Sequence, residues 1–216
     1  MRLAELSRRS GVSTATIKFY LREGLLPPGE RISSTQASYD EEHLRRLQLV
    51  RALIQVGGIS VADARAVLAA VDDASLDQVS RMGTAVAALP QALPGPSADD
   101  REAPTADQVA REVQERLGWL VVPENPAHLA LVSAVSALLR LGYPCDSEAL
   151  LPYGELAERL AAHEVALIEE FAAPTTQLEA AVALTVLYEP VLLSLRRLAQ
   201  AEQATRRLRG GTRGGG

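Results

Sequence analysis

Short hydroxyl side chains and cations stand close together between residues 13 and 22. Ser13, Thr14 and Thr16 can each donate and accept hydrogen bonds, and Lys18 and Arg22 carry positive charge. Small hydroxyl groups can bond base edges or phosphates, and a lysine can reach a phosphate, so this group could read duplex DNA. The same residues could instead belong to a structural corner of two helices that binds no nucleic acid.

Two short helices about a Gly-Val-Ser turn would hold these side chains. The pattern predicts a first helix over residues 3–10 and a second over residues 14–23, with Ser13 as its N-cap and Gly11 after the first helix. Four apolar residues fall where the two helices must pack on each other: Leu6, Val12, Ile17 and Tyr20. The arrangement therefore predicts a helix-turn-helix.

A series of spaced motifs continues from this helix pair to residue 71. They are Lys18-Phe19-Tyr20, EGLLPP over residues 23–28, YDEEHLRRL over residues 39–47 and GGISV over residues 57–61. In these motifs the sequence resembles the MerR family of bacterial regulators, whose pattern opens with an Arg-aromatic-Tyr element. The resemblance implies a winged helix-turn-helix head over residues 1–71.

The resemblance also implies which residues of the head contact DNA. They are Ser13, Thr14, Thr16, Lys18, Phe19, Tyr20, Arg22, Arg31 and Tyr39. The sequence departs from the family pattern in two places. Lys18 replaces an arginine, which suits a phosphate contact better than a bidentate base contact. Thr35-Gln36-Ala37 stand where the family has Gly-Tyr-Arg, so Arg31 or the neighbouring Ser33, Ser34 and Gln36 would have to supply the phosphate contact of the wing.

The rest of the chain predicts helices, so the expected fold is all-α with a small β-wing. Helices are expected over residues 41–56, capped by Asp40, and from Ser60 to about residue 71. A helix over 76–89, capped by Ser75, matches the family's dimerisation helix. Its apolar positions are Leu76, Val79, Met82, Val86 and Leu89.

The second half is predicted as a separate helical domain. Residues 90–104 hold four prolines and a glycine and are expected to be a linker. Residues 105–209 would form the C-terminal effector or interaction domain, with helices near 106–121, 127–141, 153–172 and 177–209 and a kink or break at Pro190. Residues 210–216 are expected to be a disordered tail.

The sequence gives little support for catalysis, metal binding or a reactive thiol. The three histidines, His43, His128 and His163, are far apart, and Leu167 stands where a His-Glu-x-x-His motif would need its second histidine. We expect His43 to be solvated, and the single Cys145 to be a half-buried thiol at a helix end. No catalytic residue, metal site or cofactor is predicted, and an enzyme is the least favoured class.

Five aromatic residues are candidates for an effector pocket in the second half. They are Trp119, Tyr143, Tyr153, Phe171 and Tyr188. Aromatic side chains can line a pocket for an uncharged or weakly polar organic molecule, although the same residues could simply fill the core.

Charge separates the two halves of the chain. Residues 1–58 carry a net charge of +3, the remainder −8, and the whole chain −5. A basic head on an acidic body fits a localised DNA contact. A long uncharged apolar run and a signal peptide are both missing from the sequence, so we expect a cytoplasmic protein without a membrane partner.

The resemblance implies a mechanism as well. A homodimer would bind double-stranded promoter DNA at a pseudo-palindrome and distort it, which would act on RNA polymerase indirectly. A small organic ligand could shift the dimer between two shapes. The alternative is an architectural or recombination-directing DNA-binding factor without ligand sensing. The sequence is compatible with activation of transcription, repression of transcription, or both.

Overall fold

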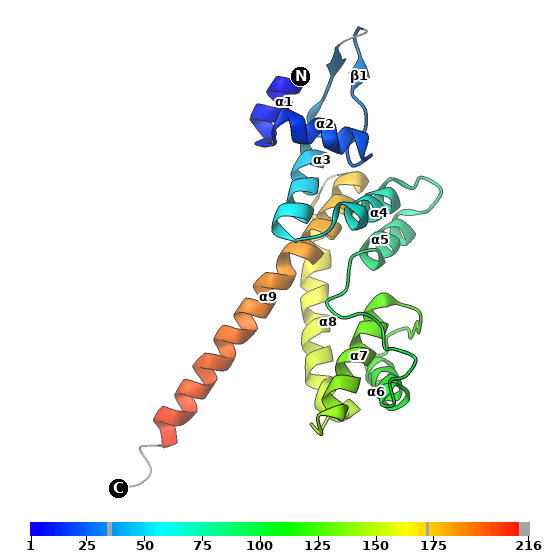
Figure 1. The fold of residues 1–216 in the computed structure, drawn as a ribbon. Coiled ribbons are helices and arrows are strands. Elements are labelled where there is room, and N and C mark those ends of the chain that lie inside the picture. The colour runs from blue at the N-terminus through cyan, green and yellow to red at the C-terminus, as the bar shows by residue number, and fades with distance from the viewer. Residues whose placement is uncertain (34–35, 172, 212–216) are drawn as a thin grey trace. The chain divides into compact units, whose positions relative to one another are not determined.

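The computed structural model describes residues 1–33, 36–171 and 173–211 (Figure 1). These residues form α-helices, one short π-helix and a two-stranded antiparallel sheet, which confirms the prediction of an all-α fold with a small β-wing. Contacts divide the chain into two units, one made of residues 1–68 and the residues from 179 onward, the other of residues 69–178. The predicted domain boundaries, which placed residues 105–209 in one domain, stay a prediction.

The first unit begins with the expected pair of helices, α1 (Leu3–Ser10) and α2 (Thr14–Arg22). Gly11 ends α1 in the left-handed conformation, with φ of 68°, and its N–H bonds the Ser7 carbonyl. The Ser13 hydroxyl caps α2 by accepting the backbone N–H of Thr16 at 3.1 Å. Leu6 and Ile17 are fully buried between the helices. The sequence therefore predicted both helices and the turn that joins them.

The wing follows α2 as the strands β1 (Glu30–Arg31) and β2 (Ala37–Ser38), in which Glu30 pairs with Ser38 and Arg31 with Ala37. Gly29 leads into β1, and a Cβ at this position would lie 2.6 Å from the Ser38 carbonyl oxygen. Only glycine therefore lets the two strands approach at their base. Ser34 and Thr35 lie outside the described residues.

Three helical segments continue the head: α3 (Glu41–Arg51), the π-helical segment η1 (Ala52–Val56) and α4 (Val61–Asp72). The Asp40 carboxylate accepts the backbone N–H groups of Glu42 and His43, both at 3.0 Å, so the predicted cap is confirmed. The expectation of a solvated His43 is wrong. His43 is buried because its ring completes the capping box with Asp40 and lies edge-on to Tyr39, with ring centroids 5.2 Å apart.

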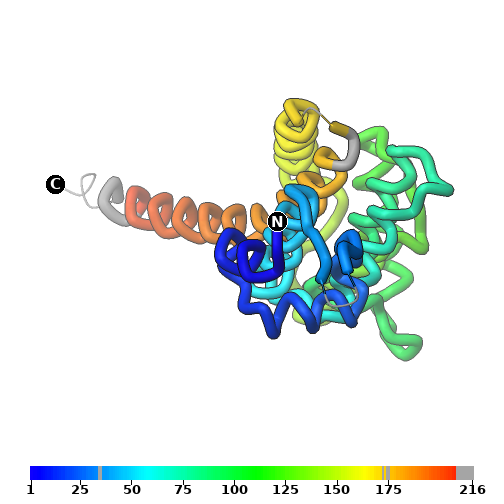
Figure 2. The backbone as a smooth tube through the Cα atoms, turned by 90° about the horizontal axis from the view of Figure 1, so that it is seen from above, coloured from blue at the N-terminus to red at the C-terminus, as the bar shows by residue number. Residues whose placement is uncertain are grey.

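The long helix α9 (Pro174–Gly211) joins the first unit from residue 179. Glu179 forms an ion pair with the buried Arg46 of α3 at 3.6 Å, and Val186 packs against Gly57 so closely that a Cβ on this glycine would overlap it. A kink or break was expected at Pro190. The break does not occur, because α9 continues on both sides of Pro190 although proline has no N–H to donate, and the kink stays a prediction. Beyond this point α9 extends away from the head (Figures 1 and 2).

The end of the chain differs from the prediction in part. Residues 210 and 211, expected to begin a disordered tail, are the last residues of α9. Residues 212–216 lie outside the described part of the chain.

The second unit holds α5 (Gln78–Ala87), α6 (Ala103–Arg116), α7 (Pro126–Arg140) and α8 (Ser147–Glu169). Its core is formed by small and β-branched residues of α6 and α7 together with a cysteine: Ala106, Val109, Ala110, Val132, Val135 and Cys145. Two predicted starts are wrong. Asp77 caps α5 where Ser75 was expected, because Ser75 bonds Asp73 in the preceding turn. Asp146 caps α8, which starts before Pro152 and runs through it.

Candidate nucleic-acid interface

The surface of α2 presents a row of side chains that could contact a duplex. Thr14, Lys18 and Arg22 are all exposed. They are four residues apart, so they share one ridge of the helix. Ser13 and Thr16 are engaged with each other, their hydroxyl oxygens 2.8 Å apart, so they shape the start of the helix while Thr14 is turned outward. The ridge therefore offers one hydroxyl and two cations in line.

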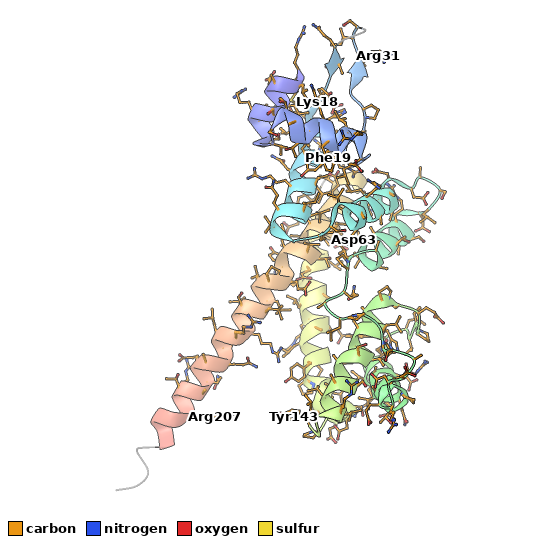
Figure 3. The ribbon with its side chains drawn as sticks, in the orientation of Figure 1. Lys18, Phe19, Arg31, Asp63, Tyr143 and Arg207 are labelled. Carbon is orange, nitrogen blue, oxygen red and sulfur yellow. The ribbon has the colours of Figure 1, made fainter. Side chains whose placement is uncertain are left out.

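Arg22 is held at the end of this ridge by its neighbours. Its guanidinium carbon lies 5.4 Å from the centroid of the half-buried Phe19 ring, within the range of a cation–π contact. The Glu23 carboxylate is 3.7 Å away from Arg22 Nε. Figure 3 shows Lys18 and Phe19 on α2 and Arg31 on the wing. Phe19 thus positions the arginine rather than standing free for a base.

The two tyrosines predicted to contact DNA are instead part of the core. Tyr20 is 4% exposed and Tyr39 is 7% exposed. Burial raises the pKa of the Tyr20 hydroxyl above its ordinary value. Both rings are thus part of the core, and a contact of their hydroxyl groups with DNA stays a prediction. Their bulky apolar rings are needed where α1, α2 and α3 meet, and they position the ridge from beneath.

The described part of the wing supplies one cation, Arg31, which is exposed on β1. Backbone N–H groups of Ile32 and Ser33 both bond the Gln36 carbonyl, at 2.9 and 3.1 Å, and this closes the described ends of the turn. Among the described residues neither the Lys18 nor the Arg31 side chain has a hydrogen bond or ion pair.

Three other cations of the head, Arg9, Arg51 and Arg65, are committed to its own structure. Arg9 donates two hydrogen bonds to Glu41, at 2.5 and 2.8 Å, and these bonds lower the pKa of the Glu41 carboxyl and raise that of Arg9. Arg65 of α4 holds both the carboxylate and the carbonyl of Glu23. Arg51 donates to the Ser10 carbonyl at 3.3 Å. These ties fix α1 and α2 on α3 and α4, and so fix the direction of the ridge.

The predicted dimer residues do not form one exposed stripe on α5. Val79 is 82% exposed, Leu76, Met82 and Val86 are half-buried, and Leu89 is buried. Leu89 is already packed within the chain, which contradicts its use on an outer surface. α5 has 10 residues, about 15 Å, which is shorter than the 14 residues predicted.

One of the predicted pocket residues, Trp119, lines a hollow in the second unit. The hollow has a volume of about 270 Å³, lies between α6 and α7, and has Leu120, Val122 and His128 among its other walls. Tyr143, Tyr153 and Phe171 are exposed and do not line this hollow, and Tyr188 belongs to α9 in the first unit. A pocket shared by all five aromatic residues stays a prediction.

A buried hydrogen-bonded group forms the floor of the hollow. His128 Nε2 lies 2.8 Å from an Asp107 carboxylate oxygen, and its Nδ1 lies 2.8 Å from the Gln114 amide nitrogen. The pKa of Asp107 is lowered, first by a hydrogen bond from Arg111 and then by one from His128. Sequence reasoning missed His128 and Gln114 as lining residues, although their i, i+14 spacing across a predicted helix break could have indicated a contact.

Metal and thiol chemistry remain unsupported in the described residues. They contain no group of three or more His, Cys, Asp or Glu side chains that could hold a metal ion. Cys145 is buried in the second unit, and burial and the charge of Asp146 raise the pKa of its thiol. The sequence expectation of a half-buried, unreactive thiol understated its burial.

One helix among the described residues is long and apolar enough to cross a membrane. By length and composition alone, residues 176–207 of α9 are apolar enough, and 22% of the residues in the apolar window are buried. Charged residues within this stretch, such as Glu189 and Arg196, explain why the sequence contains no long uncharged apolar run. This length and composition are weak evidence, since core helices of proteins without a membrane also have them.

Comparison with known proteins decides the family. Residues 1–71 match the family model described as MerR HTH family regulatory protein. The crystal structure of SCO5550 from Streptomyces coelicolor A3(2), described as a "putative transcriptional regulator", is similar over almost its whole length. It is 51% identical, with 96% of this chain and 97% of that chain covered and a TM-score of 0.81. The chain belongs to the MerR family.

Curated MerR-type relatives match a shorter stretch. The transcriptional regulator ZntR homolog of Haemophilus influenzae is 38% identical over 50 residues, which are 23% of this chain. The regulator AdhR of Bacillus subtilis is 32% identical over 57 residues, 26% of this chain. The match covers 37% and 41% of the length of these two relatives. The MerR assignment therefore rests on the helix-turn-helix head, where the ridge and the wing lie.

Proposed function

We propose that this MerR-family chain is a sequence-specific DNA-binding transcription regulator, which binds promoter DNA as a homodimer. The observation that carries the proposal is the exposed ridge of Thr14, Lys18 and Arg22, flanked by Arg31 on the wing. Arg9, Arg51 and Arg65 of the head are committed to internal bonds, while the side chains of Lys18 and Arg31 have no hydrogen bond or ion pair among the described residues. A surface of this kind suits a negatively charged duplex.

The side chains of the ridge suit different parts of the duplex. An α-helix fits the major groove, so α2 would lie there as the recognition helix. Thr14 is short enough for its hydroxyl and methyl groups to meet base edges. Lys18 and Arg22 reach further and would contact phosphates, and Arg31 would contact the backbone beside the groove. On this proposal Thr14 contributes to sequence preference and the cations contribute to affinity.

A dimer would bind two such half-sites and deform the DNA between them. Two recognition helices related by two-fold symmetry read half-sites about 34 Å apart, or a multiple of this distance. Bending or untwisting the DNA costs a few kcal/mol, so a modest change in dimer shape could alter promoter geometry. RNA polymerase would respond to the altered promoter without having to bind this protein. The protein would act in the cytoplasm.

We further propose that a small organic effector binds the second unit at the hollow beside Trp119. Its walls include Leu120, Val122 and Leu131, and its floor is His128. Both ring nitrogens of His128 are engaged by Asp107 and Gln114, so the histidine offers its ring face rather than a free charge. These walls suit an uncharged, weakly polar ligand.

Enrichment of genomic fragments on the purified full-length chain tests the DNA-binding proposal. We expect the wild-type chain to enrich a small set of fragments that share an inverted repeat. A Thr14→Ala variant should enrich a different or more degenerate repeat. Uniform recovery of all fragments by both proteins would overturn sequence-specific binding.

Tryptophan fluorescence tests the effector proposal, because Trp119 is the single tryptophan of the chain. A library of organic compounds should contain ligands that change this emission and raise the melting temperature. A Leu120→Asp variant, which places a charge in the wall, should lose the response. A response to metal salts alone would overturn the proposal of an organic effector.

A further inference from the structure

Gln114 of α6 stands in the wall of the hollow beside Trp119, and the structure determines which way its amide group is turned. The amide nitrogen lies 3.0 Å from the Ala110 carbonyl oxygen and 2.8 Å from Nδ1 of His128. A carbonyl oxygen can only accept a hydrogen bond, so the atom that faces Ala110 must be the NH2 group. The amide oxygen of Gln114, Oε1, has no hydrogen bond among the described residues.

His128 takes the second hydrogen of the same amide. Its Nε2 lies 2.8 Å from an Asp107 carboxylate oxygen, and a carboxylate can only accept a hydrogen bond. Nε2 therefore carries a proton, and Nδ1 of the neutral ring is left as the acceptor for Gln114. His128 is 5% exposed, so water does not readily replace these bonds. Both hydrogens of the Gln114 amide are thus used within the chain.

Arg111 anchors the other end of this hydrogen-bonded chain of groups. Its Nε donates to the second carboxylate oxygen of Asp107 at 2.7 Å. If the Gln114 amide were turned around, Oε1 would face the Ala110 carbonyl oxygen and Nδ1 of His128. Both contacts would then join two acceptors, which is unfavourable. The chain of groups therefore keeps Oε1 as the free acceptor of the hollow.

We propose that Oε1 of Gln114 accepts a hydrogen bond from the effector, so that the hollow selects small, neutral aromatic molecules that carry an N–H or O–H group. This inference rests on the proposed effector site at the hollow and names the class of ligand that it takes. The volume of about 270 Å³ is just below the roughly 300–1,000 Å³ that is usual for ligand pockets, so a molecule of one or two rings suits it. Trp119, Leu120 and Leu131 give the ring apolar surfaces to pack on.

The surroundings of the hollow favour a neutral donor over a cation. Among the described residues, its walls contain no Asp, Glu, Lys or Arg. Asp107, beneath His128, is already paired with Arg111. A carboxylate oxygen of Glu158 lies 3.4 Å from Nε1 of Trp119 and can accept a hydrogen bond from the polar edge of that ring. The hollow thus offers a ligand an oriented acceptor rather than a free negative charge.

A ligand with only acceptors cannot use this position. An ether or carbonyl oxygen placed beside Oε1 would set two acceptors against each other, and Oε1 would lose water without gaining a partner. An N–H or O–H group replaces the lost water. A net hydrogen bond of ordinary strength corresponds to about ten-fold in affinity. Two ligands of equal shape should therefore differ by about this factor when only one of them carries the donor.

Indole and benzofuran test the inference, because they have nearly the same shape and differ by an N–H group against an oxygen atom at one ring position. Trp119 is the single tryptophan, so the full-length chain labelled with nitrogen-15 gives one tryptophan side-chain N–H signal, and its source is a wall of the hollow. Titration with each unlabelled probe, followed at this signal, measures its affinity. We expect indole to bind about ten-fold more tightly than benzofuran.

Gln114→Met removes the acceptor and keeps the length of the side chain. This variant should bind indole and benzofuran with about equal affinity. Gln108→Met is the matched control, because Gln108 is on the same helix but is exposed, bonds Glu112 and does not line the hollow. It should keep the preference for indole. Thermal melting followed by circular dichroism must show that both variants are folded.

The orientation of the amide has a test that needs neither a ligand nor a variant. In nitrogen-15 spectra of the wild-type chain in mildly alkaline buffer, His128 should carry a proton on Nε2 and none on Nδ1. The side-chain amide hydrogens of Gln114 should exchange slowly with solvent, because both are hydrogen-bonded. A proton on Nδ1 of His128 would mean that the amide is turned the other way, and it would overturn the inference.

The binding experiment separates failure of this inference from failure of the effector site. Equal affinities of the wild-type chain for indole and benzofuran would overturn the selection of donors and leave the effector site standing. A preference for indole that survived Gln114→Met would assign the acceptor to another residue and would also overturn the inference. If neither probe bound while other compounds of the library did, the proposed ligand class would be wrong. If no compound moved the Trp119 signal, the effector site itself would be overturned.

Discussion

Replacement of Lys18 by alanine tests the role of the α2 ridge. Lys18 is exposed, it has no hydrogen bond or ion pair among the described residues, and it lies between Thr14 and Arg22 on one ridge. Its removal should therefore cost the head little stability. Each lost phosphate contact lowers the slope of log K against log salt by about 0.9, so a dimer should lose about two units of slope. Between 1 M and 0.1 M salt, a slope change of about 0.9 is a factor of about eight in the binding constant. At 0.1 M salt we therefore expect binding to be about eight-fold weaker for each lost contact, or about sixty-fold weaker for a dimer.

Fluorescence anisotropy with a selected and a scrambled duplex at several salt concentrations measures both quantities. Lys18→Ala should weaken both duplexes by similar factors, because a phosphate contact carries no sequence information. Arg116→Ala is the control, since it removes an exposed cation of α6 in the other unit. It should leave the slope unchanged. A Lys18→Ala variant that changed base preference with an unaltered slope would refute the assignment of Lys18 to a phosphate.

Three further predictions concern stability and reactivity. The Asp40 carboxyl has its pKa lowered to about 2, chiefly by its hydrogen bond with His43, so the stability it adds is present above about pH 4 and is lost as the pH falls towards 2. Asp40→Ala should lower the free energy of unfolding by about 1 kcal/mol near neutral pH and flatten the curve of this free energy against pH between about pH 4 and 2. An unchanged curve in this pH range would contradict the role of Asp40 as a cap. Gly57→Ala should cost about 1–3 kcal/mol in chemical denaturation, because its Cβ would overlap Val186, whereas Gly83→Ala, with open space around it, should be neutral or stabilising. Cys145 should react with iodoacetamide much more slowly in the native chain than in denaturant, since the thiol is buried and its pKa is raised; equal rates would show that the second unit opens readily.

The parts of the fold that local sequence determines were predicted well. Gly11 ends α1, the Ser13 hydroxyl begins α2, Gly24 follows the end of α2, and the Asp40 carboxylate begins α3. These signals act over a few residues, so one sequence contains them completely. The cap of α5 shows the limit, because Asp73, Ser75 and Asp77 compete within five residues. Asp73 bonds Ser75 in a turn, and Asp77 is left to cap the helix.

The parts that depend on distant contacts could not be predicted from local pattern. Val186 packs on Gly57 although well over a hundred residues separate them, and nothing near either residue indicates the other. The same contact places α9 in the first unit rather than in a C-terminal domain. His43 stands in the exposed-looking first turn of α3, and only the packing of Tyr39 buries it.

The candidate site divides in the same way. Residue type and spacing identified the ridge of Thr14, Lys18 and Arg22, because helical periodicity alone puts them on one line. The burial of Tyr20 and Tyr39 needed the tertiary structure, since an aromatic residue serves equally well as a core side chain and as a DNA contact. The hollow beside Trp119 depends on how α6 and α7 meet, which composition does not describe.

Hydroxyl-radical footprinting of the full-length chain on an enriched fragment tests the central claim most directly. The account predicts two protected half-sites on one face of the duplex, related by an inverted repeat and about one helical turn, or a whole number of turns, apart. Protection should weaken at both half-sites together in Lys18→Ala. A single unrepeated half-site would contradict the dimer, and the absence of protection at every salt concentration would contradict the assignment of the α2 ridge as a DNA-reading surface.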